Sequence, residues 1–239
     1  MKREQDLIDY LFAGGTESLS RELLSWMRAS LRFTEFVEDY RDKIRKKIRT
    51  ASEPEGLLDV RAELDIARGL LSDKRVKVNY ELGASSKQRI PDFSITYREN
   101  LVFNIEVARM QRKATTGSEN DLARKEERIV RTLLEKLGQM QPGIPNLLAI
   151  HTPEHVARSI DLGTLMQRVK IRADAKDPAL YANSGYDGPA SYYKDFLHLS
   201  GILLWAPGAQ YWINKQARPA MDEKVLRLVG SLAKGGWIQ

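Results

Sequence analysis

The sequence predicts an α/β protein in which a mixed β-sheet carries helices on both of its faces. Residues 92–97 and 103–108 alternate between apolar and polar side chains, a pattern typical of two strands joined at a turn over 98–100. An amphipathic pattern over 121–138 and a continuous apolar run over 146–152 follow. Strand, helix and strand in this order predict a right-handed crossover, so the third strand should lie parallel to the second.

The remaining elements follow from the same periodicities. Thr34 is expected to cap the second of the early helices, and Glu126 is expected on the outer side of the helix over 121–138. In chain order we expect helices over 17–30, 34–50 and 57–71, a strand over 76–80, a helix over 153–171, a loop over 173–194, strands over 196–206 and 209–217, and a closing helix over 219–234.

Composition narrows the functional class. The 239 residues are enough for one large domain or two small ones, and the absence of cysteine excludes thiol chemistry and zinc knuckles. The charged N-terminus has no apolar stretch long enough for a signal peptide or a membrane span, so we expect a cytoplasmic protein without a membrane partner. A net charge of +6 favours a polyanionic partner.

Two acidic residues interrupt the apolar strands of the predicted hairpin. Asp92 shares a strand face with Ser94, and Glu106 shares one with Ala108, because side chains alternate along a strand. If the strands pair as a hairpin, both carboxylates can face the same side. Acidic groups among apolar ones are costly unless they are hydrated, paired or bound to a cation, so this pair is a candidate metal site.

Pro91-Asp92, a hairpin turn and Glu106-Val107-Ala108 form a motif that resembles the signature of the PD-(D/E)xK nuclease superfamily. The resemblance implies a restriction-endonuclease-like fold and a metal-dependent nuclease that hydrolyses phosphodiester bonds in DNA. It also implies Mg²⁺ or Mn²⁺ bound by Asp92, Glu106 and the backbone carbonyl of Val107.

A glutamate on a helix before the first core strand often joins the metal site in this superfamily. Glu63 matches that position, with Asp65 as the second choice. The alternative interpretation is an exposed Glu63 paired with Arg61 or Arg68.

The superfamily's lysine is replaced by Ala108, which carries no charge. A cation from elsewhere would have to substitute, and Lys113 is assigned this catalytic role beside Asp92 and Glu106. The other candidate substitutes are Lys87, Arg89 and Gln111.

The resemblance covers about residues 57–217. We therefore expect a helical extension over 1–54 packed on an α/β domain over 55–239. DNA is the expected partner, and a homodimer is plausible by analogy because cutting both strands often uses two sites.

Two alternatives to an active nuclease remain open. The fold could have lost catalysis and serve as a nucleic-acid- or protein-binding module. Alternatively, Asp92 and Glu106 could pair with Arg89 and Arg109 in an unrelated α/β domain.

The end of the helix over 34–50 is densely basic. It is interpreted either as a solvated helix face or as a DNA-backbone contact made by Arg45, Lys46, Lys47 and Arg49. The histidines at positions 151 and 155 are expected at a strand end and on a helix surface rather than as a ligand pair.

Overall fold

The computed structural model describes residues 2–13, 18–51, 54–81, 90–110, 122–182 and 184–233. By its internal contacts the chain divides into two compact units, Met1–Tyr80 and Glu81–Gln239. Within the described residues no helix is both long enough and apolar enough to cross a membrane.

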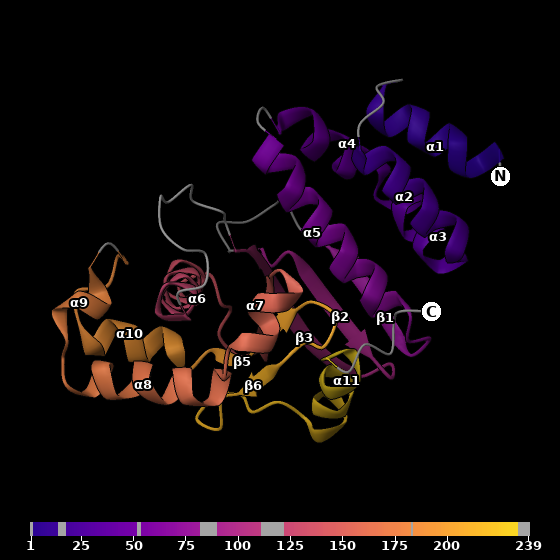
Figure 1. The fold of residues 1–239 in the computed structure, drawn as a ribbon. Helices are drawn as coiled ribbons and strands as arrows, with labels where there is room; N and C mark the ends of the chain where they lie inside the picture. The colour runs from indigo at the N-terminus through magenta and orange to yellow at the C-terminus, as the bar shows by residue number, and fades with distance from the viewer. Residues whose placement is uncertain are drawn as a thin grey trace. The chain divides into compact units, whose positions relative to one another are not determined.

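The first unit is a group of helices followed by one strand (Figure 1). Helix α1 packs on α2 and α4, while α5 packs on α2, α3, α4 and β1. The aromatic rings of Trp26, Phe33 and Phe36 follow one another in its core, and Tyr80 packs on Phe36. The elements are α1 (Lys2–Phe12), α2 (Ser18–Ala29), α3 (Leu31–Asp39), α4 (Arg41–Thr50), α5 (Pro54–Leu71) and β1 (Val76–Tyr80).

Three features of the first unit differ from the sequence prediction. Helix α1 was not expected, yet Leu7, Ile8 and Leu11 are buried on one side of it. The predicted helix over 34–50 is two helices, α3 and α4, which meet at Tyr40. Ser30, not Thr34, caps α3, because its hydroxyl accepts a hydrogen bond from the backbone N–H of Phe33.

A mixed sheet organises the second unit, with its strands side by side in chain order. The β2–β3 and β5–β6 pairs are antiparallel, whereas β4 runs parallel to both β3 and β5. The predicted hairpin and the predicted parallel crossover are both confirmed. These strands are β2 (Phe93–Tyr97), β3 (Leu101–Arg109), β4 (Asn146–His151), β5 (Leu199–Trp205) and β6 (Tyr211–Ile213).

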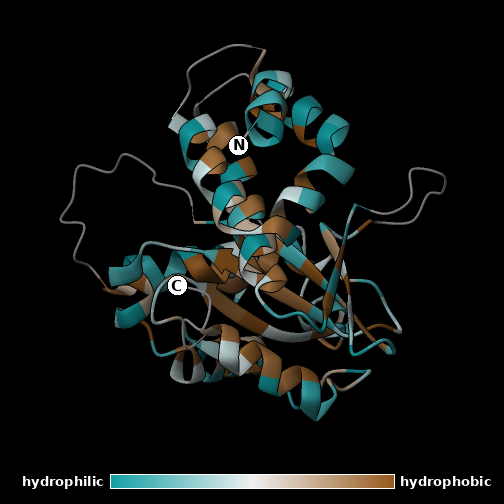
Figure 2. Ribbon diagram, turned by 90° about the vertical axis from the view of Figure 1, so that its right-hand side faces the viewer, coloured by the Kyte–Doolittle hydropathy of each residue, from teal (hydrophilic) through white to brown (hydrophobic). Residues whose placement is uncertain are grey.

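Helices cover both faces of this sheet, as the sequence predicts. Ala108, Leu148 and Ile202 share one face, and they belong to a buried cluster with residues of α6 to α10. On the other face α11 packs against β5 and β6, and in Figure 2 the strands are largely hydrophobic in colour. The helices are α6 (Leu122–Leu137), α7 (Glu154–Ser159), α8 (Leu162–Asp174), α9 (Pro178–Tyr181), α10 (Pro189–Phe196) and α11 (Glu223–Ala233).

Three further predictions are corrected in the second unit. The helix over 153–171 is two helices, because the chain breaks at Ile160 and Asp161 caps α8. The predicted loop over 173–194 contains α9 and α10, and each begins with a proline, a residue suited to the first turn of a helix. Glu126 is buried rather than outside, where its carboxylate binds Arg168 of α8.

Candidate functional site

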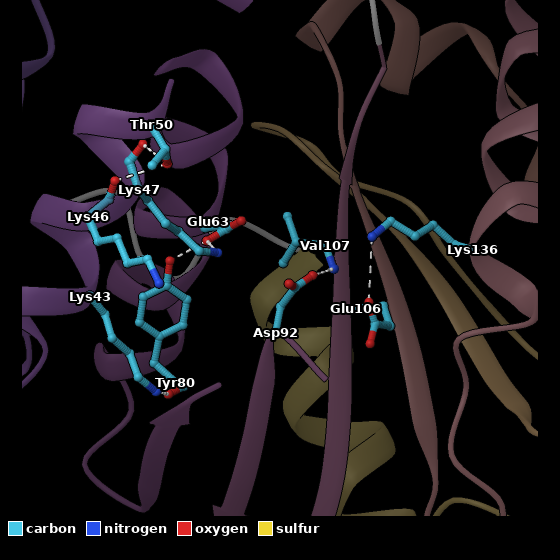
Figure 3. Close-up of polar contacts among 10 residues, drawn as sticks. All are labelled: Lys43, Lys46, Lys47, Thr50, Glu63, Tyr80, Asp92, Glu106, Val107 and Lys136. Carbon is cyan, nitrogen blue, oxygen red and sulfur yellow. Dashed lines mark hydrogen bonds and ion pairs between the residues drawn. The ribbon is translucent and has the colours of Figure 1, made fainter. Parts of the chain in front are cut away.

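The carboxylate of Asp92 is held at the point where β2 begins. Its Oδ2 atom accepts a hydrogen bond of 2.7 Å from the backbone N–H of Val107 in β3 (Figure 3). Its backbone carbonyl accepts a bond of 3.0 Å from the N–H of Glu81. Asp92 is half-buried and follows the buried Pro91, so both its backbone and its side chain are fixed.

Glu106 projects from the middle of β3, on the strand next to Asp92. Phe93 pairs with Ile105, so the same register places Asp92, the residue just before β2, opposite Glu106. Glu106 is only 3% exposed. One carboxylate of the predicted pair therefore comes from β3 and the other from the residue that leads into β2.

The environment of Glu106 disfavours its charged form. Burial raises the pKa of Glu106 most, the negative charge of Asp92 raises it further, and Lys136 opposes both, which brings the pKa to about 8. A carboxyl group with this pKa holds its proton at neutral pH unless another positive charge approaches the pair. The arrangement can thus bind either a proton or a cation.

Lys136 of α6 is the residue that sequence analysis missed. Figure 3 shows its side chain extending toward Glu106. Its Nζ atom lies 3.6 Å from Oε2 of Glu106, and the side chain is about one quarter exposed. Lys136 follows Ile129 by seven residues and Leu133 by three, and both of those residues are buried. That spacing places Lys136 beside the inward stripe of the helix, a signal that the sequence already contained.

Ala108 occupies the position of the superfamily's lysine and is buried in the cluster beneath α6. Its methyl group offers no cation to the site. The substitutes predicted from the sequence, Lys87, Arg89, Gln111 and Lys113, all lie outside the described residues.

Glu63 lies in the first unit and makes its described contacts there. Its Oε2 atom accepts a bond of 2.6 Å from Nζ of Lys47 and a second bond from the hydroxyl of the buried Tyr80 (Figure 3). Of the partners considered from sequence, Arg61 binds Glu22 and Arg68 binds Asp65, the second-choice ligand. Glu63 is therefore part of a structural polar group of this unit.

The basic end of α4 also makes contacts within the first unit. Lys43 donates to the backbone carbonyl of Tyr80, Lys47 binds Glu63, and the guanidinium of Arg45 lies over the ring of Tyr10. Lys46 and Arg49 are exposed. At least three of these basic side chains thus stabilise the unit, which is a role beyond the solvated face predicted from sequence.

Across the described part of the chain, no group of three or more acidic, histidine or cysteine side chains is arranged to hold a metal ion. The metal ligands available at the candidate site are two carboxylates and backbone carbonyls. Such hard oxygen ligands fit Mg²⁺ or Mn²⁺, because Mg²⁺ is commonly bound by one or two carboxylates with water and phosphate oxygens.

No protein-family model, curated protein or solved structure matches this chain. The resemblance to the PD-(D/E)xK nucleases rests on the motif from Pro91 to Glu106. The candidate site is accordingly defined by three side chains of the second unit: Asp92, Glu106 and Lys136.

Proposed function

We propose that this chain is a metal-dependent nuclease that hydrolyses phosphodiester bonds in DNA and has a restriction-endonuclease-like fold. One observation carries the proposal: Asp92, just before β2, lies opposite Glu106 of β3, and the ammonium of Lys136 lies 3.6 Å from the carboxylate of Glu106. Two carboxylates and a lysine are the chemical groups of the motif that the sequence resembles. The net charge of +6 supports a polyanionic substrate.

Asp92 and Glu106 would hold Mg²⁺ or Mn²⁺, and the carbonyl of Val107 is a third ligand by resemblance. When bound, such a cation supplies a water of lowered pKa and compensates charge on the phosphate oxygens. Glu63 stays a prediction as a further ligand. In the structure its carboxylate is bound by Lys47 and Tyr80, and it would have to leave these partners to reach a cation.

The residues of the site would orient the ligands, exclude bulk water and supply positive charge. The N–H of Val107 orients Asp92, while burial of Glu106 keeps bulk water away from its carboxylate. The ammonium of Lys136 lies 3.6 Å from the same carboxylate, so it brings positive charge to a site that has Ala108 where the motif has lysine. A fixed ammonium there would stabilise negative charge that develops on a phosphate.

Thermal unfolding in rising concentrations of Mg²⁺ or Mn²⁺ tests the metal site without relying on activity. A cation that binds the native state raises the melting temperature, so the wild type should be stabilised. Asp92→Asn and Glu106→Gln should lose this response, while Glu223→Gln, an exposed position on α11, should keep it. Equal stabilisation of all four proteins would overturn the proposed site.

Ala108 favours a second candidate function, in which a nuclease-like fold binds nucleic acid or protein without cutting. Its methyl group lies where the motif has its lysine. Metal-dependent stabilisation and salt-sensitive DNA binding, with no cleavage in the presence of Mg²⁺ or Mn²⁺, would favour this candidate over the enzyme.

A further inference from the structure

The second unit has a depression with a volume of about 450 Å³, lined by residues of α8, α10 and the loop after β6. Polar and charged side chains dominate its lining, which includes Lys170, Asp174, Tyr193, Lys215 and Arg218. None of them belongs to the proposed nuclease site. The charged lining of this depression is therefore not accounted for by the nuclease proposal.

The acidic residue of the depression is already neutralised. Asp174 accepts a bond of 2.5 Å from Nζ of Lys170 and another from the hydroxyl of Tyr193. These two partners hold the pKa of Asp174 below its usual range, so its carboxylate stays charged and paired. Burial and this same contact raise the pKa of Tyr193, which keeps its proton.

Two cations of the lining remain. Within the described ranges, the side chains of Lys215 and Arg218 have no carboxylate partner, and both are exposed to solvent. Together with the neutralised Lys170–Asp174 pair, they leave the depression with surplus positive charge. A guanidinium and an ammonium that line the same depression are suited to the oxygens of a phosphate group.

The backbone that carries these two cations is fixed in place. The side-chain amide of the buried Asn214 donates to the carbonyls of Phe196 and Leu199, and its oxygen accepts from the N–H of Gln216. The N–H of Arg218 donates to the carbonyl of Leu197, at the end of α10, over 2.7 Å. The backbone from which both side chains extend is therefore held in a defined position.

We propose that this depression binds the phosphate group of a nucleotide, either free or within a nucleic-acid strand, through Lys215 and Arg218. Its volume exceeds that of a phosphate group and leaves room for an attached sugar. The proposal does not depend on the nuclease function, because it uses neither the carboxylate pair nor a metal.

Isothermal titration calorimetry of the full chain, at low salt and with EDTA present, tests the proposal. The probes are adenosine monophosphate, adenosine and a short single-stranded oligothymidylate. EDTA keeps the proposed metal site from contributing. The Lys215→Gln/Arg218→Gln protein should bind the phosphate-bearing probe roughly tenfold more weakly, since it loses both charged donors.

Lys224→Gln/Arg227→Gln on α11 is the matched control, because it removes the same charge from another exposed surface of this unit. It should bind like the wild type. Binding of the monophosphate but not of adenosine identifies a free nucleotide as ligand, whereas binding of the oligonucleotide without the monophosphate identifies a strand phosphate.

The proposal is overturned if neither phosphate-bearing probe binds, if adenosine binds as tightly as its monophosphate, or if both double variants weaken binding equally. Each of these results leaves the metal response of Asp92 and Glu106 unaffected. Failure of this proposal is thus distinguishable from failure of the proposed nuclease.

Discussion

The ammonium of Lys136 and the carboxylate of Glu106 lie 3.6 Å apart, although 30 positions separate them in the chain. The parallel crossover from β3 through α6 to β4 produces this approach, because it packs α6 on the sheet face that carries Glu106. The ammonium of Lys136 in α6 therefore lies beside β3, the strand that carries Glu106 and Ala108.

Glu106 should make the stability of the protein depend on pH. The pKa of Glu106 is about 8 in the folded protein against 4.5 for a free glutamate. Between these values the native state binds more protons than the unfolded state, so the free energy of unfolding falls as pH rises and levels off above the folded pKa. The loss should be on the order of a few kcal/mol.

Urea unfolding of the wild type and of Glu106→Gln, measured from about pH 5 to about pH 9 in EDTA, checks this sign. The neutral variant should gain stability relative to the wild type as pH rises. Glu223→Gln is the control and should follow the wild type at every pH. A constant difference between Glu106→Gln and the wild type would show that Glu106 does not titrate in this interval.

Lys136→Met is predicted to reduce the rate of DNA cleavage by about 100-fold, because the site loses the ammonium that would stabilise charge on the phosphate. Lys125→Met, on the same helix but outside the site, should retain wild-type cleavage. Single-turnover rates with plasmid DNA measure both. Unchanged cleavage by Lys136→Met would assign the missing cation to another residue.

Glu63→Gln is predicted to lower the free energy of unfolding by roughly 1–3 kcal/mol, since it weakens the bonds to Lys47 and Tyr80 in a poorly solvated place. Glu22→Gln removes a more exposed carboxylate from its pair with Arg61 and should cost less than about 1 kcal/mol. Denaturant unfolding compares the two. Equal losses would contradict the structural role given to Glu63.

Much of this architecture follows from local patterns in the sequence. The alternation in 92–97 and 103–108 predicts β2 and β3, and the apolar run over 146–152 predicts a parallel β4, as observed. The facing of Asp92 and Glu106 follows from the same period of two. These features were predictable because strand alternation and the order strand, helix, strand are visible in short stretches of chain.

Features set by single contacts were harder to predict. The break at Tyr40 interrupts a continuous apolar period, and the burial of Glu126 depends on Arg168, 42 residues later in the chain. Lys136 is a similar case, because the apolar stripe predicts the helix but not which of its polar side chains reaches Glu106. Pairing between distant charged residues is decided by tertiary packing, which periodicity does not describe.

The most direct test of the central claim is cleavage of plasmid and single-stranded DNA by the wild type, Asp92→Asn and Glu106→Gln, each with Mg²⁺, with Mn²⁺ and with EDTA. We expect cation-dependent cleavage by the wild type, with both variants inactive although folded, and Glu223→Gln as active as the wild type. Cleavage that survives in either Asp92→Asn or Glu106→Gln, or a wild type that binds the cation yet cuts neither substrate, would contradict it.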